Sequence, residues 1–569
     1  MSRNSNNSIA RAVASFRGGD LSSAERIAKR VVLSQPRDFH ALHLLGLIKA
    51  MKGDPSEAVK LFKKALLVND GVAELHSNMA KAQVELGCYD DALLSYDKVI
   101  ALGGGRPEIL LDKGSALTLL ERHEEALAVY DAALALRPDY ADAWSNRGTV
   151  LDHLRKHDEA LESFDKANAL APNHANAWTN RGIALDNLKR FDEALACHDK
   201  ALAINPSHAK AWCNKGVTLV NLGRCDEALG CYHKAIACKP NYADAHFNEA
   251  ICRISSCDFA LGWQKYEWRW KTPKFISLRP TFSIPQWNGL STDRSLLVWG
   301  EQGVGDQIFF CSMLEALNTL QNNLIVATDE RLHALLARSY PQFEFIPLNI
   351  PSLERCTTDA QIALGSIGQF ILRDTRDFAQ IKHGYLKSDS EKTNLLRKRI
   401  AEPGKIICGL SWASNKAKLG HEKSLDIKAL APVLGVENVV FVNLQYGDTD
   451  ADLAYAKESL GIEINNFADV DKFNDLDALA SLVDACDIVV TVSNVTAHLA
   501  GALAKKTFLM LPRAQGKLWY WHNGKGASLW YPTIQFFEQA KDGDWESVID
   551  GVRDAVRCFR DKSASGSAR

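Results

Sequence analysis

The stretch Leu296–Gln307, LLVWGEQGVGDQ, determines how we interpret the second half of this 569-residue chain. Its four leading apolar residues predict a buried strand, and Gly300, Gly303 and Gly305 then predict a turn that small residues favour. A helix is expected next, because Asp306 precedes the apolar run IFFCSMLEAL. Strand, glycine turn and helix predict the opening unit of a doubly wound α/β domain, with a ligand bound at the turn.

Asp306 is unusual in such a turn. The free N–H groups and partial positive charge of a helix N-terminus favour a phosphate or another oxyanion, which a carboxylate repels. The glycine spacing also differs from the dinucleotide-binding and P-loop motifs. The residues leave two roles open for Asp306: it caps the helix, or it is a base that takes a proton from an acceptor hydroxyl.

Composition excludes several classes of function. The formal net charge of −2 gives no support for a nucleic-acid partner. No apolar segment approaches the length of a membrane span, so we expect no membrane insertion. The 13 cysteines are scattered singly, without the spacing of a metal site. We therefore expect reduced thiols and a cytoplasmic location.

The first half of the chain repeats with a period of about 34 residues. Alanine, glycine, tryptophan and proline each recur in their own register, which suits two helices that cross closely and a proline that ends the second one. Repeats are expected to begin near Ser5, Phe39, Ala73, Pro107, Ala141, Ala175 and Ala209, with a truncated one near Ala243. This pattern resembles the tetratricopeptide repeat family over residues 1–260.

A row of polar residues recurs on the first helix of each repeat, which is the helix that lines the concave face of such a solenoid. The row consists of Asn78, Asp112, Asn146, Asn180, Asn214 and Asn248. An amide both donates and accepts, so a ladder of amides could bind the backbone of an extended protein acceptor. The alternative is a row of tolerated polar residues on an exposed face. The arrangement is similar to the asparagine ladder of the protein O-GlcNAc transferases.

Beyond the repeats, the pattern predicts a junction followed by two lobes with alternating strands and helices. Residues 261–295 form a Trp-rich junction in which Trp263, Trp268 and Trp270 serve as packing. Residues 296–390 form an N-terminal, acceptor-side lobe, and residues 391–560 form a C-terminal, nucleotide-sugar lobe. The amphipathic segment DWESVIDGVRDAVRCF could cross back onto the first lobe, and residues 561–569 are expected to be a disordered tail.

The second lobe carries its own candidate phosphate turn. Ser493, Asn494 and Thr496 follow a buried strand and open a helix that includes His498. Hydroxyl, amide and backbone N–H groups at a helix start suit a nucleotide phosphate. Ser411, Lys423 and Gln445 follow other strands of this lobe and are further candidates for donor binding. For His498 and the charged loop before Lys423, structural or surface roles are the alternatives.

The C-terminal half resembles the heptosyltransferase-like GT-B glycosyltransferases, on the motifs GVGDQ, SWASN, FVNLQYGD, TVSNVTAHLAGAL and LWYWHN. It is more similar to a bacterial subgroup fused to tetratricopeptide repeats, which includes proteins proposed to glycosylate flagellin. The resemblance implies an α-solenoid followed by a two-lobed Rossmann-like α/β enzyme, and it assigns Asp306 as the general base. Heptosyltransferases have an Asp-Thr pair where this chain has Ser493 and Asn494, which disfavours a heptose donor.

Together, these features predict an inverting, metal-independent protein O-glycosyltransferase that transfers a sugar to Ser or Thr. The donor would be a CMP- or UDP-linked sugar, such as a nonulosonic acid, and the acceptor would be flagellin or another protein held by the repeats. No cofactor beyond this cosubstrate is expected. The alternatives are a catalytically silent repeat scaffold and an envelope polysaccharide glycosyltransferase.

Overall fold

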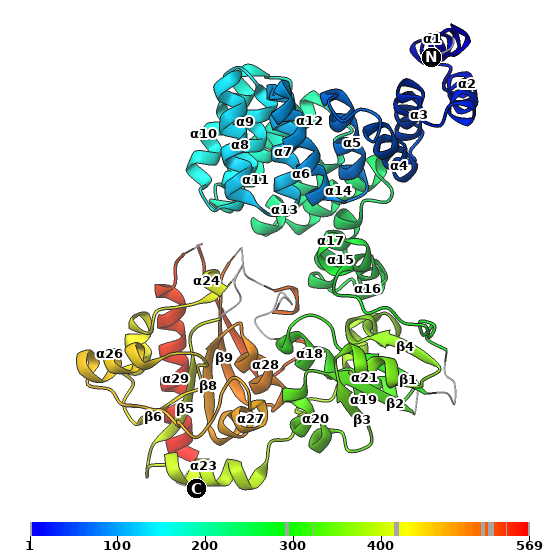
Figure 1. Ribbon diagram of the computed structural model, residues 1–569. Coiled ribbons are helices and arrows are strands. Elements are labelled where there is room, and N and C mark those ends of the chain that lie inside the picture. The colour runs from blue at the N-terminus through cyan, green and yellow to red at the C-terminus, as the bar shows by residue number, and fades with distance from the viewer. Residues whose placement is uncertain are drawn as a thin grey trace. The chain divides into compact units, whose positions relative to one another are not determined.

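The computed structural model describes residues 3–290, 295–320, 323–414, 420–513, 518–521, 528–541 and 543–566 (Figure 1). The chain divides into two compact units, Met1–Lys215 and Gly216–Arg569. Within the described ranges, no helix is both long and apolar enough to cross a membrane.

Paired antiparallel helices make up the first unit and continue into the second. The pairs are α1 (Arg3–Arg17) and α2 (Leu21–Ser34), α3 (Phe39–Met51) and α4 (Pro55–Leu66), α5 (Ala73–Glu85) and α6 (Tyr89–Val99), α7 (Pro107–Leu119) and α8 (His123–Leu136), α9 (Ala141–His153) and α10 (His157–Leu170), α11 (Ala175–Asn187) and α12 (Phe191–Ile204), α13 (Ala209–Asn221) and α14 (Cys225–Cys238), and α15 (Ala243–Ser255) and α16 (Phe259–Tyr266). The predicted repeat starts from Phe39 to Ala243 are confirmed to the residue.

The glycine register explains why the two helices of a repeat can cross so closely. A Cβ atom on Gly148 would lie 2.7 Å from the ring of Phe164, and one on Gly114 would lie 2.5 Å from the ring of Tyr130. Any larger side chain would therefore push the helices apart. The tryptophan register has a polar function as well, because the indole N–H of Trp144 donates to the carbonyl oxygen of Pro138 at 2.8 Å.

Ion pairs link successive repeats in the first unit. An aspartate on the second helix of one repeat pairs with a lysine or arginine on the first helix of the next, in the pairs Asp97–Lys113, Asp131–Arg147, Asp165–Arg181 and Asp199–Lys215. In the second unit the same two positions hold His233 and Glu249, 3.1 Å apart. The last repeat thus has a buried carboxylate at the position where the earlier repeats have a lysine or arginine.

Two parallel sheets form the rest of the second unit. The first contains β1 (Leu296–Trp299), β2 (Leu324–Thr328), β3 (Glu344–Pro347) and β4 (Ala360–Ala363); the second contains β5 (Ile406–Ser411), β6 (Val439–Asn443), β7 (Ile464–Asn465), β8 (Ile488–Val492), β9 (Lys506–Leu511) and β10 (Ile534–Glu538). The α-helices of this region are α17 (Pro273–Ile276), α18 (Val304–Cys311), α19 (Leu314–Asn318), α20 (His333–Ser339), α21 (Ile350–Arg355), α22 (Gly368–Ile371), α23 (Ser390–Ile400), α24 (Gly420–Lys423), α25 (Ala431–Leu434), α26 (Asp450–Leu460), α27 (Leu476–Ala485), α28 (Val495–Ala502) and α29 (Glu546–Gly566).

The strand orders are β3-β2-β1-β4 and β10-β9-β8-β5-β6-β7. Numbered from its own first strand, the second sheet follows the order 3-2-1-4-5-6 of doubly wound α/β domains, and the first sheet has the first four strands of that order. The order reverses between β1 and β4 in one sheet and between β5 and β8 in the other. Ligand crevices of doubly wound domains lie at such reversals.

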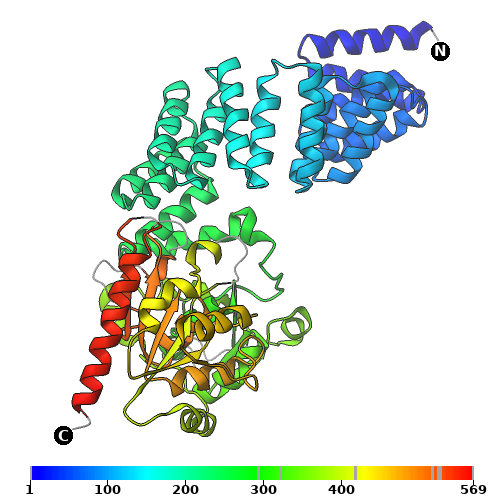
Figure 2. The ribbon, with the colours of Figure 1, turned by 90° about the vertical axis from the view of Figure 1, so that its left-hand side faces the viewer.

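Two predictions about the C-terminal segment are wrong. Helix α29 packs on β9, β10 and α25 of the second sheet (Figure 2), because the apolar side chains of Val548, Ile549, Val552 and Val556 are buried in the core of that sheet. It does not return to the first sheet. The helix also continues through residues 561–566, which we expected to be disordered, while residues 567–569 lie outside the described ranges.

The predicted repeat boundary at residue 260 does not match the packing of the chain. The buried side chains of Ile254 in α15, and of Phe259, Trp263 and Tyr266 in α16, belong to the same hydrophobic core as β1 and α18. The ring of Trp263 packs directly on Gly368, where an added Cβ atom would lie 2.4 Å from the ring. The last repeat is therefore built into the α/β unit, and the compact units divide near residue 215.

Candidate functional site

The glycine turn forms as expected between β1 and α18, but Asp306 is not the first capping residue. Gly303 occupies the N-cap position, and Asp306 stands in the first turn of α18, where its Oδ2 accepts a hydrogen bond from the Gly303 N–H at 3.1 Å. Asp306 therefore has a capping role from within the helix. Its other oxygen, Oδ1, lies 3.4 Å from the hydroxyl of Tyr520.

Tyr520 belongs to the short 3-10 turn η7 (Trp519–Trp521). Burial, and after it the nearby Asp306 carboxylate, raise the pKa of Tyr520, so its hydroxyl stays protonated and donates to Asp306. The neighbouring Trp521 donates its indole N–H to Ser493 Oγ at 2.8 Å. The turn η7 thus contacts Asp306 in the glycine turn after β1 and Ser493 in the candidate phosphate turn after β8. In the sequence, this segment contributes only to the family resemblance and none of its residues is a predicted site residue, although three consecutive aromatic residues are a visible signal.

The second turn is arranged around Asn494, which caps α28. Its Oδ1 accepts from the N–H of Ala497 at 3.2 Å and from the hydroxyl of Thr491 at 3.2 Å. Its Nδ2 donates to Ser411 Oγ at 2.7 Å and to the carbonyl oxygen of Ala413 at 3.1 Å. These bonds use the full capacity of the amide. The side chain of Asn494 is therefore fully engaged in holding the turn, and a donor contact by this residue stays a prediction.

Ser411 and Gln445 have the same kind of internal role. Gln445 Oε1 accepts from Ser411 Oγ at 2.9 Å and from the N–H groups of Trp412 and Ala413 at 3.0 and 2.8 Å. Both side chains are buried. Together with Asn494 they join the carboxyl ends of β5, β6 and β8, where the order of the second sheet reverses. The structure brings these predicted residues together, and their side chains bind one another and the backbone of the turn.

Ser493, Thr496 and His498 surround the start of α28. His498 is buried, stacks on Trp521 with ring centroids 4.9 Å apart, and has its Nδ1 3.2 Å from the Tyr531 hydroxyl. Thr496 is fully buried, and its Oγ1 has no hydrogen-bond partner among the described residues. Lys423 ends α24 and is 2% exposed, so it is not a lysine of an open surface loop.

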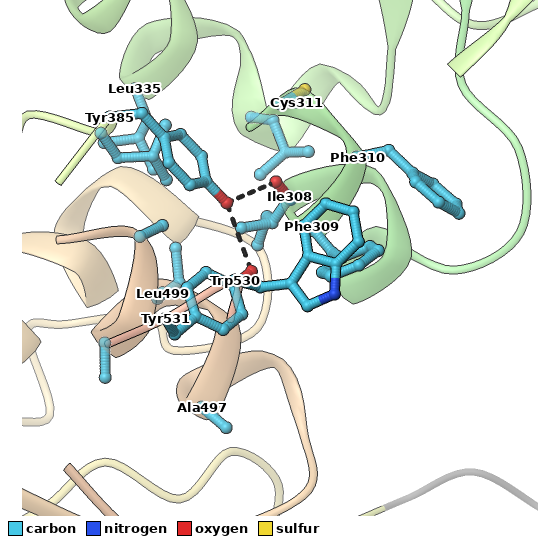
Figure 3. Packing of buried hydrophobic residues seen from close by; sticks show 14 of the residues in the cluster. Ile308, Phe309, Phe310, Cys311, Leu335, Tyr385, Ala497, Leu499, Trp530 and Tyr531 are labelled. Carbon is cyan, nitrogen blue, oxygen red and sulfur yellow. Dashed lines mark hydrogen bonds between the residues drawn. The ribbon is translucent and has the colours of Figure 1, made fainter. Parts of the chain in front are cut away.

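Helices α18 and α28 lie side by side at their N-terminal ends. A Cβ atom on Gly305 would lie 3.0 Å from Cδ2 of His498, so the glycine permits this close approach. Behind the two helix starts, aromatic side chains fill the space between the sheets (Figure 3). Tyr385 donates to the carbonyl oxygen of Ile308 at 2.7 Å and lies 3.3 Å from the Tyr531 hydroxyl. The site therefore joins both sheets in one packed unit.

The predicted asparagine row is half-buried throughout, as residues lining a groove would be. Asn146 Nδ2 donates to Ser115 Oγ at 3.4 Å and Asn180 Nδ2 to Thr149 Oγ1 at 3.3 Å, so each amide touches the preceding repeat. Asn78 Nδ2 lies 3.0 Å from His43 Nε2, and Asp112 pairs with Lys81 at 3.3 Å. Asn214 lies in the first unit with these residues, and Asn248 lies on α15 of the second.

No group of three or more His, Cys, Asp or Glu side chains that could hold a metal ion occurs within the described part of the chain. The site instead offers hydroxyl, imidazole and backbone N–H groups around two helix starts. Such groups suit an anionic ligand.

Comparison with known proteins defines the class of the first half. Residues 9–72, 114–151, 141–174, 175–208 and 209–242 match models of the tetratricopeptide repeat. The first half of the chain thus contains tetratricopeptide repeats, and these repeats lead into an α/β fold with two parallel sheets. Solenoids of this class present extended concave binding surfaces to other proteins.

The chain is similar to Protein FlbA of Caulobacter vibrioides, with 32% identity over 321 residues, which covers 52% of each protein. It therefore spans about half the length of this curated relative. Among solved structures, it is similar to a tetratricopeptide repeat protein from Parabacteroides merdae (19% identity, TM-score 0.40, 44% of this chain and 99% of that one). It is also similar to MamA from Desulfovibrio magneticus (25% identity, TM-score 0.27, 30% and 96%).

Proposed function

We propose that this protein is an inverting, metal-independent protein O-glycosyltransferase of the GT-B architecture. The observation that carries the proposal is the meeting of two helix starts, one from each sheet, with the Asp306 carboxylate in the first turn of α18 and His498 in the first turn of α28. A carboxylate beside an anion-binding helix start fits a base on the acceptor side and a phosphate on the donor side.

In this proposal Asp306 takes the proton of an acceptor Ser or Thr hydroxyl. The hydroxyl oxygen forms a bond to the anomeric carbon of the sugar while the bond between that carbon and the phosphate oxygen breaks. The nucleotide leaves with both electrons of that bond, and the configuration of the sugar inverts. Tyr520 holds the carboxylate through its hydroxyl, at 3.4 Å from Oδ1.

The leaving phosphate would be stabilised by the N–H groups at the start of α28 and by side chains around it. Thr496 is the best-supported ligand, since a buried hydroxyl without a partner among the described residues is costly unless something binds it. Ser493, His498 and Lys423 would complete the set. Ser411, Gln445 and Asn494 act behind them by fixing the turn.

The acceptor would be a protein held along the asparagine row, and by resemblance flagellin is the first to test. The donor would be a CMP-linked nonulosonic acid or a UDP-linked sugar. We place the reaction in the cytoplasm, which is consistent with the 13 cysteines all being free thiols.

The variant Asp306→Asn tests the base. The amide oxygen of Asn can still accept from the Gly303 N–H, so the cap is retained, but the side chain can no longer take a proton. We expect sugar transfer to flagellin to fall roughly 10²- to 10⁴-fold, measured by mass spectrometry, with CMP and UDP affinity unchanged.

Asp329→Asn is a matched control. Asp329 follows β2 at the same edge of the sheet and also caps a short helix, η3 (Glu330–Leu332), by accepting from the Arg331 N–H. It should transfer sugar at the wild-type rate. Wild-type transfer by Asp306→Asn would leave Asp306 with a capping role only.

A catalytically silent scaffold is the second candidate, and the aromatic packing favours it. Phe309 lies 4.4 Å from Trp530 and 4.7 Å from Tyr520, centroid to centroid, so much of the space between the sheets is filled by the protein itself. Calorimetry with CMP and UDP separates the two candidates. A scaffold binds neither, whereas the enzyme binds the nucleotide of its donor.

A further inference from the structure

Arg269 is a fully buried arginine that neither the repeats nor the proposed reaction uses. It lies in the 3-10 turn η2 (Glu267–Lys271), directly after the last repeat helix. Its Nε and Nη2 donate to Glu301 at 2.9 and 2.7 Å, and Nη2 also donates to Ser366 Oγ at 2.7 Å. Its guanidinium lies 4.3 Å from the ring centroids of both Tyr266 and Trp270. The planar guanidinium of arginine, with five N–H donors in a fixed geometry, suits such an enclosed set of partners.

The place of this ion pair in the first sheet is informative. Glu301 follows β1, whereas Ser366 and Gly365 follow β4, and Gly365 N–H donates to Glu301 Oε1 at 2.9 Å. The sheet order reverses between β1 and β4, so this is the position where doubly wound domains usually hold a ligand. Here the position is filled by a side chain from the end of the solenoid.

Contacts on both sides of Arg269 connect the last repeat with the turn of Asp306. On the repeat side, Lys265 pairs with Glu249 of α15 at 2.6 Å. On the turn side, Gln302 Nε2 donates to the hydroxyl of Tyr266 at 3.0 Å. Gln302 has a φ of +63°, a backbone conformation that needs support from neighbouring contacts.

A buried ion pair is a poor source of stability, because the cost of removing both charges from water offsets most of their attraction. It does impose a defined geometry, since a bidentate arginine–carboxylate pair is strongly directional. A packed apolar pair could stabilise this junction equally well without fixing the turn. The Arg269–Glu301 pair thus fixes the geometry at the point where the last repeat meets the α/β fold.

We propose that Arg269 is a positioning residue: through Glu301 it holds the turn that carries Asp306 in a fixed place relative to the last repeat. An acceptor bound on that repeat would then have a fixed distance to the carboxylate. The role in transfer depends on the proposed glycosyltransferase function, whereas the mechanical role does not.

The variant Arg269→Lys in the full chain tests the mechanical role. Lysine keeps the positive charge but lacks the fork that binds Glu301 and Ser366 together. Arg279→Lys is the matched control, because Arg279 also lies over the ring of Trp270, at 5.6 Å, but is outside the pair. Hydrogen exchange by mass spectrometry is measured on peptides covering residues 296–311, 360–370 and 488–502.

We expect Arg269→Lys to raise exchange in the first two peptides by roughly tenfold or more, as expected for the loss of a strong paired contact, and to leave residues 488–502 unchanged. Arg279→Lys should resemble the wild type in all three. Wild-type exchange in Arg269→Lys would overturn the proposal. If Arg269→Lys raises exchange in all three peptides, the variant is generally unfolded and Arg269 only stabilises the fold. That result would also overturn the proposal.

The second measurement is steady-state transfer to flagellin from a CMP-linked nonulosonic acid and from a UDP-linked N-acetylhexosamine. A small misplacement of the base should lower kcat roughly 10- to 100-fold while the KM for the donor stays at its wild-type value. An equal change in kcat and donor KM would contradict positioning. If the wild type transfers neither sugar, the proposed function fails, and the exchange experiment still decides whether Arg269 holds the turn.

Discussion

Among single residues, Asn494 has the most demanding set of contacts. Replacing it with alanine removes the cap of α28 and takes one buried hydrogen bond from each of Ser411, Ala413 and Ala497. We expect Asn494→Ala to lower the free energy of unfolding by about 2–4 kcal/mol, from the loss of a cap and of buried hydrogen bonds. Denaturant unfolding of the variant measures this.

Thr496→Val provides the comparison for Asn494→Ala. It removes a hydroxyl that has no hydrogen-bond partner within the described chain, so stability should hold or rise while CMP or UDP binding weakens. If Asn494→Ala instead kept full stability and lost only nucleotide affinity, its amide would be a ligand after all.

These residues show what a sequence reveals about a site. The order of strands places Ser411, Gln445 and Asn494 at one edge of the sheet, and that neighbourhood is predictable because parallel strands share their carboxyl ends. Whether each side chain faces a ligand or another side chain depends on distances of an ångström, which no pattern encodes. The capping role of Asp306 was likewise one of two readings that the residues left open.

At the scale of elements, the asparagine row of the first unit is the feature to test. Changing Asn146, Asn180 and Asn214 to alanine together should weaken acceptor binding, by about 0.5–1.5 kcal/mol for each lost hydrogen bond. Repeat packing should survive, because it rests on the buried alanine and glycine registers. A pull-down of flagellin by the full chain, titrated with acceptor, measures the effect.

The matched control changes polar residues that lie elsewhere on the repeats, the exposed aspartates Asp131, Asp165 and Asp199, to asparagine. That triple variant should bind as the wild type does. If both triple variants bind flagellin with equal affinity, the asparagine row is only a solvent-exposed face of the repeats.

The last repeat has a carboxylate whose charge depends on its partners. Burial alone raises the pKa of Glu249, but hydrogen bonds from Lys265 and Arg253 outweigh burial and the pKa is lowered from its ordinary value of 4.5. Its stabilising effect is therefore present above about pH 4.5 and is lost as the pH falls through the lowered folded-state pKa.

Glu249→Gln removes this charge at every pH. At neutral pH the variant should be about 1.5–3 kcal/mol less stable than the wild type, the range for hydrogen bonds to charged groups. As the pH falls below about 4.5 and through the lowered folded-state pKa, the difference should shrink, because the wild-type carboxylate becomes neutral too. Glu227→Gln, in an exposed pair with Arg224, should change the free energy of unfolding by no more than about 1 kcal/mol. If Glu249→Gln is less stable than the wild type by the same amount at every pH, the charge of Glu249 is not the source of its stabilising effect.

Elements differ in how far the sequence predicts them. The repeat helices were predictable to the residue because alanine, glycine and proline recur in fixed registers. The strands β4, β7 and β10 are harder to predict, since β4 and β7 are short and β10 follows an irregular, aromatic-rich segment. Helix α29 was predicted as a helix, but its apolar face did not reveal which sheet it covers.

At the scale of the whole molecule, the boundary between its parts is set by the shared core and not by the end of the repeat pattern. Ile254 and Phe259 come from the last repeat but are buried with residues of β1 and α18 in one hydrophobic core. A pattern of repeats cannot show this, because the apolar positions that usually face the next repeat here belong to the core of the α/β fold.

Two truncated chains test this boundary. A chain of residues 209–569 keeps α13 to α16 whole, and we expect it to unfold cooperatively and to bind CMP or UDP as the full chain does. A chain of residues 261–569 loses the side chains of Ile254 and Phe259, each worth about 1.5–3 kcal/mol of burial, as well as the Glu249–Lys265 pair. Since whole domains are stable by only about 5–15 kcal/mol, this chain should unfold at a clearly lower temperature or aggregate. Calorimetry of both chains at equal concentration measures the difference. Equal midpoints would show that the last repeat is dispensable to the α/β unit and that the domain boundary lies near residue 260.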